Sequence, residues 1–171
     1  MLFGKRGKNS ENKISTIIEG TTIEIVKLTT FLGLFLDSNL NWKDHILQLS
    51  QKLAKSIGIL TCAKQFLNVK TLRQLYYSFL FPYISYCNII WGNASENTLW
   101  PIFRQQKHAI RIIYNMRRRD SSKFAFKTLK LLRLPDIYKF SVLLFLYKYK
   151  NGLLPPIEID HYPTRAANQQ K

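Results

Sequence analysis

Short apolar runs near the N-terminus predict β-structure. Residues 14–18 and 23–26 are rich in β-branched side chains and flank an expected turn at 19–21. A third run, 31–36, is apolar without a break, which is typical of a strand buried on both faces. Gly33 lies inside this run, and a strand glycine marks either a bulge or a place where another backbone or a ligand comes close.

From residue 38 onward, apolar positions recur at intervals of three and four, which predicts amphipathic helices. Pro82 cannot sit inside a helix without the loss of a hydrogen bond, so the second helix should break near residue 81 and continue to Trp91. Residues able to cap or start a helix mark the expected beginnings. These are Asn41, Asn68, Asn97 or Thr98, Ser121 or Ser122, and Pro135.

The predicted fold is mainly α, with about five helices and a small N-terminal β piece that forms a hairpin or three strands. The last helix should end at Asn151-Gly152. Its expected buried side consists of Ile137, Phe140, Leu143, Leu144 and Tyr147. The segment 156–171 is polar and should form a loose tail.

Charge narrows the possible functions. The chain of 171 residues has 26 Lys and Arg against 10 Asp and Glu, a formal net charge of +16. Such an excess indicates a polyanionic partner, either nucleic acid or an anionic membrane. The excess is concentrated between residues 104 and 150, where a cationic ridge fits a phosphate backbone. Its expected contact residues are Arg104, Lys107, Arg111, Arg117, Arg118, Arg119, Lys123 and Lys127.

Other readings of these features stay open. Part of the basic segment would simply complement a helix dipole or be solvated. The stretch 74–95 has no charged residue and is long enough to span a bilayer, but its Gln, Asn, Ser and Tyr content favours a buried helix pair and no membrane association. Cys62 and Cys87 form no C-x-x-C motif, which indicates a reducing, intracellular location.

Catalytic chemistry is not indicated by the sequence. Two-metal phosphoryl transfer needs paired carboxylates, whereas Asp37 stands alone and is expected to be a turn residue. His45, His108 and His161 have no metal-ligand spacing. We therefore expect no catalytic residue, no metal site, no cofactor and no small-molecule substrate in this chain.

Several motifs, in order, resemble one family. Residues Phe31-Leu32-Gly33, Asp37, Leu40, Trp42, His45 and Ile46 resemble the end of the palm in non-LTR (LINE-type, jockey-like) retrotransposon reverse transcriptases. The next block resembles the thumb of that family: Leu75-Tyr76, Ser78, Pro82, Tyr86-Cys87 and Trp91-Gly92. The following blocks are similar to the end of the thumb and the region beyond it: Gln106-Lys107, 109–113, Leu129, Leu132, Leu134, Asp136 and Leu154-Pro155.

This resemblance implies a division of the chain. Residues 1–37 would be a remnant of the palm, 38–116 a thumb-like helical domain, and 117–155 basic C-terminal helices. The resemblance also implies that Phe31, Leu32 and Gly33 belong to a primer-grip-like turn, and that the thumb helices contact RNA or an RNA–DNA hybrid by shape and phosphate.

The chain departs from the family in one important respect. The fingers and the catalytic palm, whose paired aspartates bind Mg²⁺ in the intact enzyme, lie upstream of the motifs found here. We expect a truncated piece that is inactive alone and that would pair with the rest of a polymerase in the nucleus or cytoplasm. Two alternatives are a host-retained basic module that binds nucleic acid or protein, and a basic helical protein associated with membranes.

Overall fold

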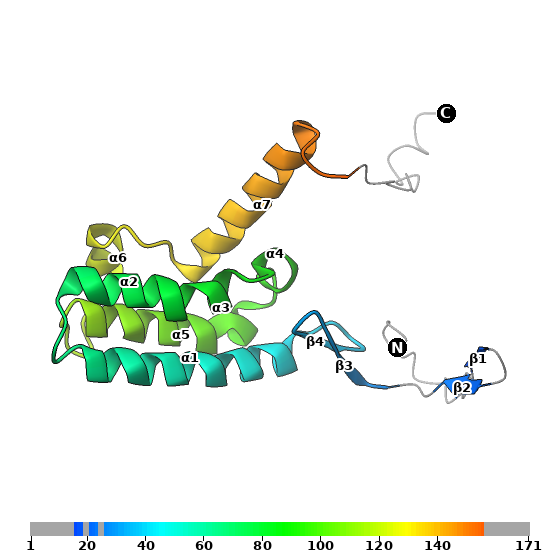
Figure 1. Cartoon of the computed structure of the whole chain (residues 1–171), viewed down its shortest axis with the longest axis horizontal. Coiled ribbons are helices and arrows are strands. Elements are labelled where there is room, and N and C mark those ends of the chain that lie inside the picture. Colours follow the sequence, from blue (N-terminus) through cyan, green and yellow to red (C-terminus); the bar gives the residue numbers. More distant parts are fainter. Residues whose placement is uncertain (1–15, 19–20, 24–25, 156–171) are drawn as a thin grey trace.

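The structure, a computed structural model, describes residues 16–18, 21–23 and 26–155 and is mainly helical, as predicted. Three helices run side by side, with α2 antiparallel to α1 and α5 packed along α1 (Figure 1). The expected tail 156–171 lies outside the described residues. The helices in the described part are α1 (Lys43–Ala63), α2 (Val69–Phe79), α3 (Phe81–Ser85), α4 (Asn88–Trp91), α5 (Glu96–Ile113), α6 (Lys123–Thr128) and α7 (Leu134–Lys150).

Two antiparallel hairpins precede the helices. Strands β1 (Thr16–Ile18) and β2 (Thr21–Ile23) pair with each other, and β3 (Leu28–Phe31) pairs with β4 (Leu34–Asp37). The expected hairpin is therefore present, whereas a three-stranded piece is not formed by the described residues. Ile14, Ile25 and the turn residues Glu19 and Gly20 lie outside the described residues.

The prediction of one continuous strand over 31–36 is wrong. The segment folds back on itself, with Phe31 opposite Leu34 and a two-residue turn between them. Leu32 and Gly33 have φ angles of 47° and 77°. Two successive positive φ values are what a type I′ turn requires, and that turn matches the twist of the flanking strands. Gly33 is therefore neither a bulge nor a strand residue. The positive φ of this position explains why glycine occupies it.

Asp37 joins the β3–β4 hairpin to helix α1. Its carboxylate accepts hydrogen bonds from the backbone N–H groups of Asn39 (3.1 Å), Asn41 (2.9 Å) and Trp42 (3.3 Å). The prediction that Asp37 is a turn residue is confirmed. Asn41 is not the N-cap residue of α1; that position is Trp42, whose own side chain makes no capping hydrogen bond.

The predicted apolar face of α1 is confirmed. It packs against α5, α2 and β4 to form the core of the bundle. The uncharged stretch 74–95 folds into α2, α3 and α4, and Tyr76, Ile84 and Trp91 are fully buried there. Among the described residues, no helix combines the length and apolar character needed to cross a membrane. The buried residues of the α1 face are Ile46, Leu49, Leu53, Ile57 and Leu60.

The side-chain amide of Gln106 links three parts of the bundle. Its Nε2 donates to the hydroxyl of Tyr76 and to the carbonyl of Leu132, both at 2.9 Å. Its Oε1 accepts a hydrogen bond from the backbone N–H of Leu134, also at 2.9 Å. Gln106 is fully buried. Burial raises the pKa of Tyr76 to about 12, although the hydrogen bond from Gln106 acts in the opposite direction.

The predicted burial of α7 is largely wrong. Leu134 and Ile137 are buried, but the exposed fractions of Phe140, Leu143 and Tyr147 are 55%, 65% and 61%. The helix contacts α3, α4 and α5 and then stands away from the bundle (Figure 1). Its apolar side chains beyond the first turns have no facing element among the described residues, so helical periodicity alone misidentified its buried side.

Gly92 allows α7 to approach α4 closely. A Cβ atom at this position would lie 2.8 Å from Cδ2 of Tyr138 on α7 and 2.5 Å from the carbonyl oxygen of Asn88. Real Cβ atoms essentially never approach another heavy atom this closely. Gly92 follows the end of α4, as expected, and its lack of a side chain also permits this helix contact.

We predict that Gln106→Leu lowers the free energy of unfolding by about 3 kcal/mol, because it leaves a buried N–H, a carbonyl and a hydroxyl without partners. Urea denaturation measures this change. The matched control is Gln105→Leu, which removes a single hydrogen bond to Ser50 and should cost about 1 kcal/mol. Equal losses in the two variants would contradict a central role for Gln106.

Candidate nucleic-acid interface

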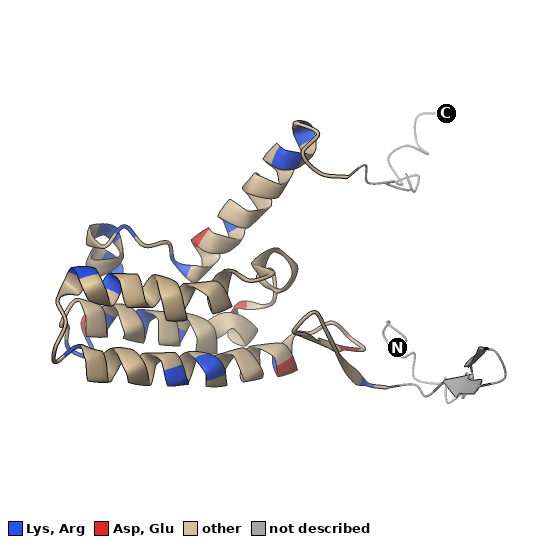
Figure 2. Ribbon diagram, viewed as in Figure 1, with Lys and Arg blue, Asp and Glu red and all other residues tan. Residues whose placement is uncertain are grey.

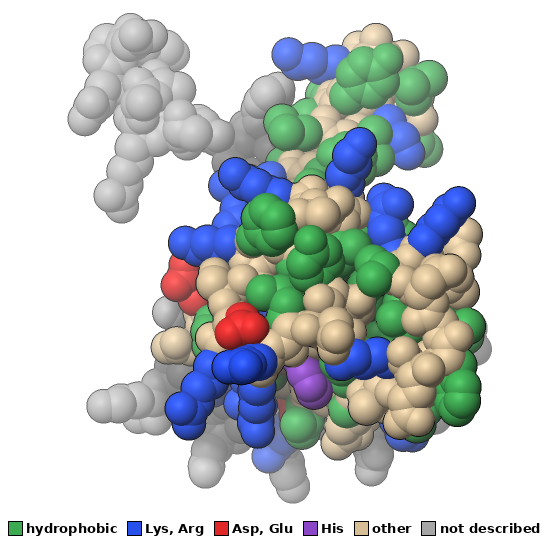
Figure 3. All heavy atoms as spheres, turned by 90° about the vertical axis from the view of Figure 1, so that its left-hand side faces the viewer, with side chains coloured by type: hydrophobic (Ala, Val, Ile, Leu, Met, Phe, Trp, Pro, Cys, Tyr) green, Lys and Arg blue, Asp and Glu red, His purple; other side chains and the backbone are tan. Residues whose placement is uncertain are grey.

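Eight predicted cationic residues form what we call the cationic surface. They come from three consecutive segments: α5, the turn after it, and α6. Blue positions mark Lys and Arg along α5, α6 and the turn between them on the ribbon of Figure 2, and Figure 3 shows blue side chains distributed over that end of the molecule. All eight are exposed or half-buried. The residues are Arg104, Lys107, Arg111, Arg117, Arg118, Arg119, Lys123 and Lys127.

Asp120 organises the turn that carries the three consecutive arginines. Its carboxylate accepts a hydrogen bond from the backbone N–H of Arg117 (2.8 Å), and its carbonyl accepts one from Nε of Arg111 (2.9 Å). Helix α5 ends at Ile113, and Asn115, two residues further on, has a positive φ of 53°. The turn is therefore held against α5, and the exposed arginines project from an ordered backbone.

Lys107 is supported by aromatic rings. Its Nζ lies 4.4 Å from the ring centroid of Trp100 and 4.0 Å from that of Phe103. Cation–π attraction of this kind holds an ammonium group in place without neutralising it. Partial burial lowers the pKa of Lys107, and the neighbouring charge of Arg111 lowers it further. Lys107 thus contributes a fixed positive charge to the surface.

His108 lies among these cations and was not identified from sequence as part of the site. Its pKa is lowered by burial and then by the charges of Arg118 and Arg111. A bound anion would offset those two charges. His108 is therefore a natural reporter of the electrostatic potential at the cationic surface, although its irregular spacing from the other histidines gave no signal in the sequence.

Acidic residues do not neutralise the cationic surface. Within the part of the chain that the structure describes, the ion pair found is the one between Arg133 and Asp136 at 2.7 Å. Each of the eight cations thus keeps its charge available to solvent or to a ligand. Mutual repulsion between neighbouring like charges is unfavourable, and a polyanion would relieve it.

Two further cations lie beside the predicted ones. Lys130 and Arg133 line a pocket of about 530 Å³ together with Lys123 and Lys127. The spacing of Lys123 and Lys127, four residues apart, was a signal in the sequence that pointed to one helical face, whereas Lys130 lies beyond the end of α6 at Thr128 and gave none. Arg133 gave no such signal, because it reaches the pocket from the loop before α7.

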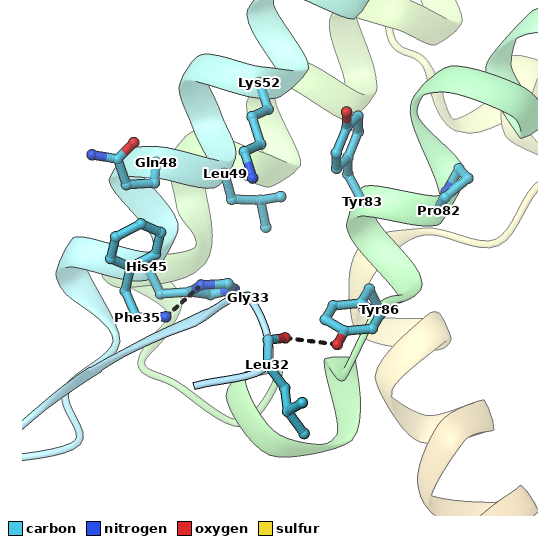
Figure 4. Close-up of a pocket in the computed structure, with 10 residues that line it drawn as sticks. All are labelled: Leu32, Gly33, Phe35, His45, Gln48, Leu49, Lys52, Pro82, Tyr83 and Tyr86. Carbon is cyan, nitrogen blue, oxygen red and sulfur yellow. Dashed lines mark hydrogen bonds between the residues drawn. The ribbon is translucent and has the colours of Figure 1, made fainter. Parts of the chain in front are cut away.

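The primer-grip-like residues lie at the tip of the β3–β4 hairpin. Phe31 and Leu32 are exposed by 61% and 72%. The hydroxyl of Tyr86 donates to the carbonyl of Leu32 at 2.7 Å and fixes the tip to the residue after α3 (Figure 4). A pocket of about 360 Å³ lies beside the turn; it is lined by Leu32, Gly33, Phe35, His45, Gln48, Leu49, Lys52, Pro82, Tyr83 and Tyr86.

The hairpin tip and most of the cationic surface lie at opposite ends of the bundle (Figure 1). The 21 residues of α1 separate them. At a rise of 1.5 Å per residue this is a separation of about 30 Å. The structure brings together the predicted cations but does not bring the hairpin turn into contact with them.

The two polar side chains at the base of the hairpin have structural roles. Nδ1 of His45 accepts a hydrogen bond of 3.5 Å from the backbone N–H of Phe35, and its ring packs beside those of Trp42 and Trp91. The carboxylate of Asp37 is occupied by backbone N–H groups. No group of three or more His, Cys, Asp or Glu residues suited to a metal ion occurs among the described residues.

No protein-family model, no curated protein and no solved structure matches this chain.

We predict that Arg118→Gln raises the pKa of His108 toward the ordinary value of 6.5, because one of the two nearby charges is removed. The rise should be partial, since burial is the larger cause. Titration of the His108 ring by NMR measures it, and Lys139→Gln on α7 serves as the control. An unchanged pKa in Arg118→Gln would show that the arginine does not act on His108.

The lowered pKa of His108 also makes the stability of the folded chain depend on pH. Because the pKa of His108 is lower in the folded chain than in the unfolded chain, its contribution to stability is present above pH 6.5 and declines as the pH falls below that value.

Proposed function

We propose that this chain binds the sugar–phosphate backbone of RNA or of an RNA–DNA hybrid through its cationic surface. The observation that carries the proposal is the succession of eight exposed or half-buried cations along α5, the turn after it and α6, without acidic ion-pair partners among the described residues. Contacts between cations and phosphates provide affinity that depends little on sequence. A role of this kind places the chain in the nucleus or the cytoplasm.

We further propose that the chain corresponds to the end of the palm and the thumb of a non-LTR retrotransposon reverse transcriptase. The motif resemblance supports this proposal, and so does the tight turn at Leu32-Gly33, which is held by Tyr86 from a segment of the thumb-like block. Phe31, Leu32 and Gly33 would then lie close to a primer end.

In this proposal the chain holds a primer and template but does not join nucleotides by itself. Nucleotidyl transfer by two metal ions depends on carboxylates that converge on them. Asp37, the acid nearest the hairpin turn, is occupied as a backbone acceptor. Catalytic carboxylates and Mg²⁺ would come from the rest of a polymerase, which is the proposed protein partner.

A second candidate function is that of a host-retained module that binds a protein. The exposed apolar side chains of α7 favour it, because a helix that is apolar on most sides is normally buried. The genomic sequence upstream of the Met1 codon separates the two candidates. A decayed reading frame with paired aspartates supports a polymerase piece, whereas a promoter and an intact first exon support a host module.

We predict that the affinity for an RNA–DNA hybrid falls by about three decades between 50 and 200 mM salt if about six phosphates are neutralised. Replacement of Arg117, Arg118 and Arg119 by Gln should flatten this dependence, because fewer counterions are released. Fluorescence anisotropy at several salt concentrations measures the slope. The control removes three charges from α7 through Lys139→Gln, Lys148→Gln and Lys150→Gln; equal slopes in the two triple variants would contradict the assigned surface.

We also predict that the purified chain with Mg²⁺, a primed template and all four deoxynucleotides gives no primer extension. The physical reason is the missing carboxylate pair. A gel assay resolves single-nucleotide additions. Clear extension by the chain alone would overturn the proposal that it only holds the hybrid.

A further inference from the structure

A second feature, an open pocket, lies at the edge of the cationic surface. The pocket of about 530 Å³ between α6 and the loop that leads to α7 has a size typical of sites for small ligands. Its polar rim comes from Lys123, Lys127, Lys130 and Arg133, together with Asp136. Its apolar lining comes from Phe126, Leu131 and Leu132.

The charges of the pocket are only partly balanced. Arg133 and Asp136 form a bidentate pair, with Nε to Oδ2 at 2.7 Å and Nη2 to Oδ1 at 3.2 Å. This pair holds the pKa of Asp136 below its ordinary value, so the carboxylate remains charged and offsets the guanidinium. The three lysines have no acidic partner among the described residues. The pocket therefore presents three unmatched ammonium groups.

The backbone at Lys130 is unfavourable for a lysine. Its φ of 52° lies in the left-handed region, where a helix normally ends with glycine. The N–H of Leu131 donates to the carbonyl of Phe126 at 2.9 Å, which completes the Schellman motif that ends α6. A glycine would adopt this conformation without strain, yet the residue present adds a third charge to the pocket.

The arrangement of the lysines is also unfavourable without a ligand. Lys123 and Lys127 are four residues apart on α6, and like charges at this spacing destabilise a helix. The left-handed backbone of Lys130 and the repulsion between Lys123 and Lys127 are thus both energetically unfavourable, and both occur at this pocket. An anion bound between the ammonium groups would replace the repulsion between Lys123 and Lys127 by attraction. It would also interact with the charge that Lys130 places at the pocket.

We propose that this pocket binds the phosphates of a nucleotide that bears a terminal phosphate or polyphosphate, with the sugar or base against Phe126, Leu131 and Leu132. A single phosphodiester carries one negative charge and matches three ammonium groups poorly. A triphosphate carries several charges and matches them well. The apolar lining provides a contact surface that inorganic phosphate alone would not use.

This inference goes beyond the proposed function, because that function requires only contacts along a backbone. The cationic surface and the pocket share Lys123 and Lys127 but differ in Lys130 and Arg133. Two sources supply the same chemistry: a free nucleoside triphosphate, or the phosphorylated 5′ end of an RNA strand. Both are therefore used as probes.

The test substitutes Lys130 by glycine, which removes the charge and suits the left-handed backbone. We expect wild type to bind ATP and to bind adenosine at least tenfold more weakly. Lys130→Gly should weaken ATP binding about tenfold, because one charged hydrogen bond is lost. Isothermal titration calorimetry measures both. Thermal unfolding should show that Lys130→Gly is at least as stable as wild type, and Lys127→Gln provides a second variant in case it is not.

Lys70→Gln is the matched control, because it removes one exposed charge outside the pocket. It should change ATP affinity by less than twofold. A 12-nucleotide RNA with a 5′-triphosphate that binds more tightly than its 5′-hydroxyl form would support the pocket with a strand end as the source. Failure of ATP and of the triphosphorylated RNA to bind better than their phosphate-free forms would overturn the proposal, as would equal losses in Lys130→Gly and Lys70→Gln. Hybrid binding by Arg117–Arg119 variants tests the proposed function separately.

Discussion

The packing of the bundle depends on one buried amide. Gln106 is fully buried in the middle of α5, and its two polar atoms satisfy a hydroxyl on α2, a carbonyl in the loop after α6 and the first N–H of α7. The Tyr76 hydroxyl and the Leu134 N–H would otherwise be buried without a partner, which is costly in a low-dielectric interior. The amide therefore fixes where the chain crosses from the bundle into α7.

The position of the loop that leads into α7 determines how the pocket is formed at the edge of the cationic surface. The loop fixed by Gln106 carries Arg133, α6 before it carries Lys123 and Lys127, and Lys130 follows the end of α6. The turn held by Asp120 completes the cationic surface on the other side of α6. At the far end of the bundle, Asp37 and Tyr86 hold the β3–β4 hairpin by backbone contacts. The helices thus separate the β3–β4 hairpin from the α6 region, and each of these two parts is held to the bundle by its own hydrogen bonds.

Sequence reasoning succeeded where one physical signal dominates. The apolar spacing of α1 predicted its buried face, because that face packs along its whole length against neighbouring helices. It failed at the hairpin, because a two-residue turn between apolar strands has the same composition as one buried strand. It also failed for α7, where periodicity identifies an apolar side but does not reveal whether another element covers it. The cations of the candidate interface were predictable from charge, whereas Lys130 and Arg133 required knowledge of the loop.

The sequence by itself determined the net charge, the helical character and the concentration of cations after residue 104, since these follow from composition and local periodicity. Only the tertiary structure decided that Leu32 and Gly33 form a turn, that α7 leaves the bundle, and that four cations from two segments surround one pocket. The physical reason is that local composition and spacing are compatible with more than one arrangement, and contacts between residues distant in the chain help to select the one that forms. Gln106 and Tyr86 make such contacts, and no local pattern encodes them.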